Sequence, residues 1–189
     1  MRREEIITVA RALFSRYGLE KTTTKDISSA LKLQKGALYY YFKNKEEIFS
    51  EVIRREMYQL QNKIGNAVRE VTGVVNKMNT YIRIRMVYLK LKADEFTTIR
   101  DEYLKNYSFI EQLREDFSNW EADLVKKILR DGNKSGELHL KDVNLVAETI
   151  TLAIKGLEYV WVTKMPAKQI ELNVGRLTSI LFNGLLHSD

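Results

Sequence analysis

Helix-breaking residues are so rare in this chain that long uninterrupted helices are the first expectation. Among 189 residues there are nine glycines and one proline, Pro166. Apolar residues recur at three- and four-residue spacing through most of the sequence, which is the period of one buried helical face. Tyr81–Met86 alternates apolar and polar residues as a strand does, but the chain offers no partner strand, so we predict helix there as well. The sequence therefore predicts an all-α fold.

Residue types that are missing exclude several classes of protein. There is no cysteine, and the two histidines are His139 and His187, so disulfide scaffolds, thiolate catalysis and nearly all zinc sites are excluded. Paired histidines and a glycine-rich phosphate loop are also missing, so we expect no metal, no cofactor and no enzymatic activity. No apolar run approaches the roughly 18 residues of a membrane span, and the charged start does not resemble a signal peptide. We therefore expect a cytoplasmic protein without a membrane partner.

Positive charge is concentrated near the beginning of the chain. The formal net charge is +6, and residues 1–50 hold ten Lys or Arg against six Asp or Glu. The other 139 residues hold 21 against 19. Such a bias suits a polyanionic partner such as nucleic acid, although by itself it also fits a solvated basic face.

Three short helices are predicted before residue 45. The apolar spacing and the capping residues set their boundaries: a first helix ending at Gly18, a second capped by Thr23 or Thr24, a connection at 32–34, and a third from Lys35 to Phe42. The buried faces are expected to contain Ile27, Ala30 and Leu31 in the second helix, and Leu38 and Phe42 in the third. Asn44 and Glu47 form a capping-box-like pair that opens a fourth helix. Two short helices joined by so short a turn fit a helix-turn-helix, whose second helix enters the major groove of DNA.

The third helix carries an unusual run of tyrosines, Tyr39–Tyr41. Leu38 and Phe42 already fill its inward face, so some of the tyrosines must point outward. There, hydroxyls can reach phosphates and rings can touch thymine methyl groups. An aromatic-rich core helix with one wet edge would give the same composition. The lysines in this region favour the interpretation as a DNA-binding surface over that of a core helix. They are Lys25, Lys32, Lys35, Lys43 and Lys45.

The same stretch resembles the signature of the tetracycline-repressor (TetR) family. The resemblance lies in Thr23–Ile27 and in the run from Lys35 to Ile48, and it extends over about residues 3–60. It implies a three-helix, helix-turn-helix DNA-binding domain at 1–46 and a larger helical ligand-binding and dimerisation domain at 47–189. At the turn, family members often have glycine where this chain has Lys32, so a positive φ there would strain the lysine.

The resemblance also implies which residues meet double-stranded DNA. By position, it assigns phosphate contacts to Thr24 and Lys25, base-facing positions to Lys35, Gly36 and Ala37, and backbone clamps to Tyr39, Tyr40 and Lys45. The missing side chain of Gly36 would let the backbone approach the groove. Lys45, at the start of the fourth helix, adds a cation to a positive helix end, which suits a phosphate better than it suits stability.

The last two predicted helices carry apolar residues around much of their circumference. An apolar surface that extends so far around a helix must be buried on two sides, one against its own subunit and one against a partner. A two-fold, four-helix interface of a homodimer is the economical interpretation and matches the family's habit. A pair of fully internal helices is the alternative. The predicted interface residues are Ile150, Ala153, Leu157, Trp161, Leu177, Leu181 and Leu185.

Large aromatic residues gather between positions 81 and 120, in a region that includes a long helix predicted over 102–130. A helical body lined by rings could enclose an apolar or aromatic ligand, with an acidic end facing Arg85. Ordinary core packing, with Arg83 and Arg85 in solvent, is the alternative. The predicted ligand-binding set is Tyr81, Arg85, Tyr88, Tyr103, Tyr107, Phe117 and Trp120.

These predictions combine into one function. We expect a ligand-responsive transcriptional regulator, a repressor, that binds a palindromic operator as a homodimer and is released by a small apolar or aromatic effector. A DNA-binding architectural protein on the same scaffold, without a ligand, is the second hypothesis, and a filled body would favour it. A helical enzyme is the third hypothesis, and the chain lacks the convergent acid-base groups that it needs.

Overall fold

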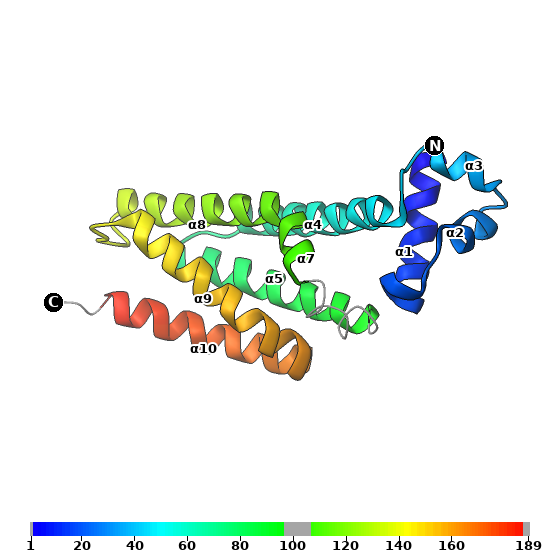
Figure 1. The fold of residues 1–189 in the computed structure, drawn as a ribbon. Helices are drawn as coiled ribbons and strands as arrows, with labels where there is room; N and C mark the ends of the chain where they lie inside the picture. The colour runs from blue at the N-terminus through cyan, green and yellow to red at the C-terminus, as the bar shows by residue number, and fades with distance from the viewer. Residues whose placement is uncertain (1, 97–106, 187–189) are drawn as a thin grey trace. The chain divides into compact units, whose positions relative to one another are not determined.

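The computed structural model describes residues 2–96 and 107–186, and in these ranges it contains helices and no strand (Figure 1). The all-α prediction is confirmed, including the helix over Tyr81–Met86. The helices are α1 (Arg2–Lys21), α2 (Thr24–Ala30), α3 (Lys35–Tyr39), α4 (Lys45–Arg69), α5 (Val74–Glu95), α7 (Tyr107–Leu113), α8 (Glu115–Ser135), α9 (Val143–Lys164) and α10 (Ala167–Leu186). Within the described ranges, no helix has both the length and the apolar surface that a bilayer crossing requires.

Two compact units share these helices. The head unit comprises residues 1–58 and 92–115, and the body unit comprises residues 59–91 and 116–189. Two helices therefore contribute to both units: α4 passes from the head unit into the body unit after Tyr58, and α5 passes back after Leu91. The head unit thus includes chain that lies well beyond residue 46.

The core of the head unit is built around α1. Ile6 and Phe14 on this helix are fully buried, and the ring of Phe14 meets that of Phe49 from α4 edge to face, with 5.3 Å between centroids. Phe96 and Ile110, from the second segment of the head unit at residues 92–115, belong to the same cluster. The other buried members are Ile7, Ala10, Leu19, Ile27, Leu38, Phe42, Ile48 and Val52. The short helices α2 and α3 therefore depend on α1 and α4 for most of their burial.

Four charged side chains form a network in the head unit. Arg11 of α1 binds Glu56 of α4 at 2.5 Å and Glu95, the last residue of α5, at 2.6 Å. Lys92 binds the same two carboxylates at 3.0 and 3.1 Å. Burial lowers the pKa of Arg11, but the hydrogen bonds and charges of Glu56 and Glu95 outweigh it and raise this pKa overall. The alternating charges keep the buried carboxylate of Glu56 paired.

The core of the body unit contains a buried arginine. Arg85 of α5 is 1% exposed, and it donates to Glu121 of α8 at 2.5 Å and to Glu158 of α9 at 2.7 Å. The hydroxyl of Tyr81 donates to the same Glu121 at 3.0 Å. Burial alone would lower the pKa of Arg85, but the charges of Glu158 and Glu121 hold it well above its ordinary value. The alternative that places Arg85 in solvent is therefore wrong, and its guanidinium already has two carboxylate partners within the protein.

Several local predictions fail for reasons that the hydrogen bonds explain. Ala30 is exposed, and Ser28 is the buried residue instead. Ser28 can be buried because its hydroxyl donates a hydrogen bond to the Lys25 carbonyl at 3.0 Å. The third helix ends at Tyr39, and Phe42 turns inward through a bond from its amide to the Leu38 carbonyl at 3.1 Å.

The helix predicted over 102–130 is divided in the structure. Arg114 separates α7 from α8, and its amide closes α7 by donating to the carbonyls of both Ile110 and Glu111 at 3.1 Å. Residues 102–106 lie outside the described ranges. The start of α9 is capped by Asp142, whose side chain accepts from the Leu145 amide at 3.0 Å.

Arg85 and Arg83 offer a matched test of the buried network. Arg85→Met would leave two buried carboxylates without their cation, so we expect it to lower the free energy of unfolding by about 3–5 kcal/mol. Arg83→Met, two residues away on the same helix, removes a side chain that is 46% exposed and 3.9 Å from Glu171. We expect it to change stability by no more than about 0.5 kcal/mol. Urea unfolding measures both, and equal effects would contradict the assignment.

Candidate nucleic-acid interface

The start of α2 is fixed by a reciprocal cap. The Asp26 amide donates to the Thr23 hydroxyl at 3.2 Å, and the Thr23 amide donates back to the Asp26 carboxylate at 2.9 Å. Of the two threonines considered as the cap, Thr23 is therefore the one used, which leaves the neighbouring Thr24 outside the cap. The hydrogen bonds from Thr23 lower the pKa of the Asp26 carboxyl. The charged carboxylate thus holds the positive end of α2 in place.

The turn between α2 and α3 contains the strained residue that the sequence indicated. Lys32 has a φ of 53°, the one positive φ among the described non-glycine residues. Its amide donates to the Ser29 carbonyl at 3.0 Å, and the Leu33 amide donates to the Ser28 carbonyl at 2.8 Å. The left-handed conformation at Lys32 reverses the chain after α2. The glycine that family members often have at this position would adopt it without strain.

The outward face of α3 carries exposed tyrosines, as predicted. Leu38 is fully buried and points into the head core, whereas Tyr40 is 84% exposed and Tyr39 is nearly half exposed. The Tyr39 hydroxyl lies 3.3 Å from the hydroxyl of Thr24, so α3 and the start of α2 meet at one polar point. A Cβ added to Gly36 would meet no protein atom within 4 Å, so packing in the free protein does not require this glycine. The side chain of Lys35 lies outside the described part of the structure.

Lys45 is placed differently from the expected clamp on the DNA backbone. Its ammonium donates to the carbonyls of Leu19, Glu20 and Thr22, at 2.8, 3.1 and 3.2 Å. In the free protein this cation is therefore bound to the end of α1 and the link that follows it. No local sequence pattern predicts this contact, because the partners lie 23 to 26 residues away.

The N-cap predicted for the fourth helix is confirmed. The side chain of Asn44 accepts from the Glu47 amide at 2.8 Å, and the Glu47 carboxylate accepts from the Lys43 amide at 2.6 Å. The pair satisfies two backbone donors where α4 begins. The direction in which the chain leaves α3 is thereby set.

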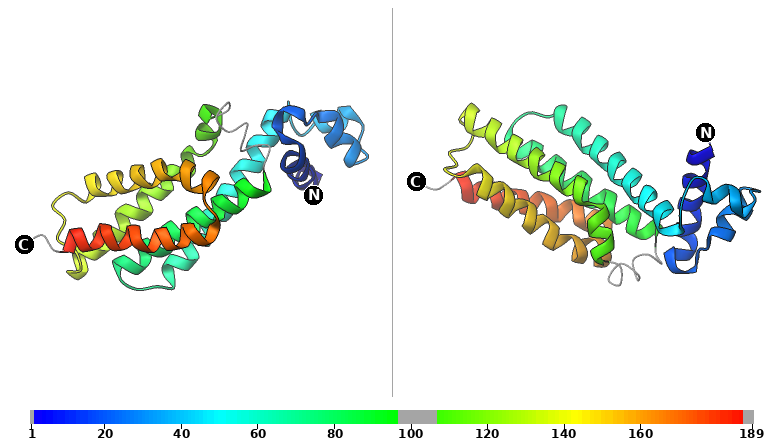
Figure 2. Two further views of the ribbon diagram at one scale, coloured as in Figure 1. Left: turned by 90° about the horizontal axis from the view of Figure 1, so that it is seen from below. Right: turned by 45° about the horizontal axis from the view of Figure 1, so that its top comes forward.

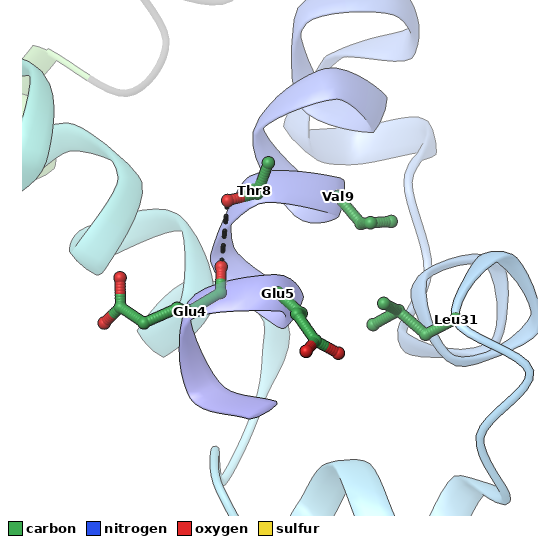
Figure 3. A pocket seen from close by; sticks show the side chains of 5 residues that line it. All are labelled: Glu4, Glu5, Thr8, Val9 and Leu31. Carbon is green, nitrogen blue, oxygen red and sulfur yellow. Dashed lines mark hydrogen bonds between the residues drawn. The ribbon is translucent and has the colours of Figure 1, made fainter. Parts of the chain in front are cut away.

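A shallow groove in the head unit lies between α1 and the residue that follows α2. Figure 3 shows Val9 and Leu31 facing each other across it, with Glu4, Glu5 and Thr8 on the α1 side. Glu4 is paired with Arg55, and Glu5 is paired with Arg2. None of the predicted DNA-contact residues lines this groove.

The structure describes most but not all of the predicted ligand-binding residues. Tyr81, Arg85, Tyr88 and Phe117 are buried in the body unit, and the rings of Phe117 and Trp120 lie 5.7 Å apart. Tyr103 lies outside the described residues, and so does the side chain of Tyr107. Among the described residues, no group of His, Cys, Asp and Glu could hold a metal ion.

The predicted dimer interface is divided as well. Ile150 and Trp161 are buried within their own body unit and have little surface left for a partner. Ala153 is exposed, Leu157, Leu177 and Leu181 are half-buried, and the side chain of Leu185 is not described. Other apolar residues, which the predicted interface set does not include, are exposed on α9 and α10: Leu145, Leu152, Tyr159, Val160, Leu172 and Ile180. The seven-residue spacing of Leu145, Leu152 and Tyr159 was the signal that could have found the α9 stripe.

Comparison with known proteins gives consistent results. Residues 6–52 match the family model of bacterial regulatory proteins of the tetR family. The HTH-type transcriptional regulator QacR of Staphylococcus aureus is 27% identical over 97% of both chains. The HTH-type transcriptional repressor KstR2 of Mycolicibacterium smegmatis is 26% identical over 77% of this chain and 72% of its own. A solved transcriptional regulator from Cytophaga hutchinsonii shares the fold, with a TM-score of 0.79 and 21% identity over 97% of this chain and 98% of that one.

Two short helices around a tight turn, the first of them capped by Thr23 and Asp26, and an exposed polar and aromatic face define a helix-turn-helix of the kind found in DNA-binding regulators of transcription. The helix-turn-helix segment at residues 6–52 belongs to the tetR family of bacterial regulatory proteins. The family resemblance read from residues 23–48 is confirmed.

Proposed function

We propose that this protein is a ligand-responsive repressor that binds a palindromic operator as a homodimer, has no enzymatic activity and acts in the cytoplasm. The observation that carries the proposal is the polar and aromatic surface of α3, where Tyr40 projects into solvent and Tyr39 meets Thr24. Exposed rings are costly unless a partner covers them, and tyrosine hydroxyls bind phosphates well. The functional division that we propose is a DNA-binding domain at 1–46 and a ligand-binding and dimerisation domain at 47–189.

The DNA contacts that we propose follow from where each residue stands on the two short helices. Thr24 and Lys25 lie in the first turn of α2, where backbone amides and the helix dipole favour a phosphate. Tyr39 and Tyr40 bind the backbone from α3. The first residues of α3 face the bases, and they are Lys35, Gly36 and Ala37.

The homodimer is supported by the apolar surface of α9 and α10. The two helices lie side by side and antiparallel (Figures 1 and 2). Leu152 and Ile180 on them are 72% and 71% exposed, too much apolar surface for a face that stays in water. A second copy would cover it with the same two helices, as a two-fold interface requires. Small residues at Ala153 and Gly156, both exposed, permit close approach.

An effector would act on DNA binding only by preferring one conformation of the dimer over another. We propose that α4 transmits this preference, because it is one helix with residues in both units. A coupling of about 1–3 kcal/mol would change operator affinity roughly 5–150-fold. The effector is apolar or aromatic and is held by the rings near Phe117 and Trp120. An acidic end is no longer required, because Arg85 already has two carboxylate partners.

The proposed function predicts the form of the operator. Selection from random duplex DNA should enrich a palindrome whose half-sites are about one helical turn, roughly 34–36 Å, apart or a near multiple of it. Two heads related by a two-fold axis can read only such a site with identical contacts. Sequencing the selected pool measures this. A pool without an inverted repeat would contradict the proposal of a two-fold operator complex.

The proposed dimer interface predicts that a charge introduced on the exposed apolar face of α9 or α10 should dissociate the dimer, whereas a charge introduced elsewhere should not. Leu152→Glu and Ile180→Glu place a carboxylate in the proposed interface, so we expect helical monomers in sedimentation equilibrium. Leu91→Glu is the control, because Leu91 is also an exposed leucine, at 56%, but lies on α5. It should remain dimeric. Dimers of unchanged mass for both interface variants would overturn the assignment.

The proposed regulation predicts reciprocal binding. A panel of aromatic compounds can be titrated against the protein with and without the selected operator, while the fluorescence of Trp120 and Trp161 is recorded. A compound that releases DNA should bind more weakly in the presence of operator, by the same factor as it weakens operator binding. Equal compound affinity in both conditions would show that no coupling exists. The absence of any bound compound, including by mass spectrometry of the purified protein, would favour an architectural role.

A further inference from the structure

We propose that Lys32, in the turn between α2 and α3, is a further phosphate contact of the helix-turn-helix. The proposal rests on the DNA-binding function of the head unit, and it adds one cation to the contacts at the start of α2 and on α3. The observation behind it is a conflict between the type of this residue and the conformation of its backbone.

The backbone at residue 32 favours a residue other than lysine. Its φ is 53°, in the left-handed region, where a Cβ approaches the following carbonyl oxygen. The turn requires this conformation, because the Lys32 amide donates to the Ser29 carbonyl at 3.0 Å and the Leu33 amide donates to the Ser28 carbonyl at 2.8 Å. Glycine adopts such a φ freely, and asparagine adopts it more readily than most residues. Lysine here therefore costs stability that either of them would avoid.

The Lys32 side chain offers the folded head little that would offset this cost. Its neighbours Leu31 and Leu33 are partly buried and pack against the head core, whereas Lys32 is exposed between them. Within the described ranges, its ammonium makes no hydrogen bond or ion pair. A cation beyond the last turn of α2 is attracted to the negative pole of that helix, but salt screens this attraction at an exposed position.

The charge of the surrounding segment also favours an anionic partner. Residues 21–45 hold six lysines and one acidic residue, Asp26. The Asp26 carboxylate is used in the cap of α2, where it accepts from the Thr23 amide. One more cation in so basic a segment adds repulsion in the free protein, and a polyanion relieves that repulsion.

The position of Lys32 suits a phosphate at the edge of the major groove. It stands three residues before Lys35, the first residue of α3, so the two Cα atoms are at most roughly 11 Å apart. Lys35 is a proposed base-facing residue, and the groove is only about 12 Å wide. A phosphate backbone therefore runs close to the start of α3. A long, flexible lysine that leaves the core at this point can bind it as a point charge.

Salt dependence separates a phosphate contact from a role within the protein. Lys32→Asn and Lys32→Gly remove the cation and introduce residues that tolerate the backbone conformation, whereas Lys32→Arg keeps the cation. Lys141→Asn is the matched control, because Lys141 is also an exposed lysine outside a helix but belongs to the body unit. Affinity for the duplex selected by the wild type, and for a fixed random duplex, is measured from about 50 to 200 mM salt.

We expect Lys32→Asn and Lys32→Gly to reduce the slope of log affinity against log salt by about 0.9, the value for one phosphate contact. The wild type should then lose roughly three- to fourfold more affinity than either variant over this range of salt. Both duplexes should show the same reduction, because phosphates carry no base information. Lys32→Arg and Lys141→Asn should retain the wild-type slope. A wild-type slope in both neutral variants would overturn the proposal, and so would an equal reduction in Lys141→Asn.

Chemical labelling of the wild-type protein tests the same contact without a variant, which covers the case of a variant that folds poorly. An amine-reactive ester acylates exposed lysines, and mass spectrometry measures the labelling of Lys32 and Lys141 with and without duplex. We expect duplex to protect Lys32 and to leave Lys141 reactive. Equal labelling of Lys32 in both conditions would overturn the proposal. Failure of the wild type to bind either duplex would contradict the DNA-binding function and, with it, this contact, a result distinct from an unchanged slope in a protein that binds.

Discussion

The two helices of the helix-turn-helix are too short to be stable alone, and the organisation of the head unit follows from this. An isolated helix needs about 12–15 residues to persist in water, whereas α2 has seven and α3 has five. Their stability must come from the burial of their apolar side chains and from the hydrogen bonds at their ends. Ile27, Leu38 and Phe42 provide the burial, on α1 and α4. The Thr23–Asp26 cap provides one end, and Lys45 closes the link that leads into α2.

Local chemistry explains which parts of this arrangement were predictable from the sequence. The caps at Thr23, Asn44 and Asp142 need only residues three or four positions apart, and all three are present. The positive φ at Lys32 could be inferred from a turn in which glycine is usual. The inward direction of Leu38 and Phe42 follows from their spacing. Each of these features is decided by a short window of sequence.

The predictions that failed for Arg85 and for the surface of α9 concern residues whose surroundings come from distant parts of the chain. The carboxylates that neutralise Arg85 lie 36 and 73 residues further on, so no local pattern distinguishes it from the exposed Arg83. The predicted interface included the buried Ile150 and omitted the exposed Leu152, because a helix that is apolar on most sides does not reveal which side faces its own core.

Phe96 and Ile110 give the head unit a place in the order of events during protein synthesis. The ribosome releases the chain from the N-terminus, so α1 to α4 emerge while two members of their own core are still being made. Arg11 likewise waits for Glu95, which is made 84 residues later. The head core cannot close until more than half of the polypeptide has been translated. A nascent chain therefore completes the core beneath its helix-turn-helix only when Ile110 has been synthesised.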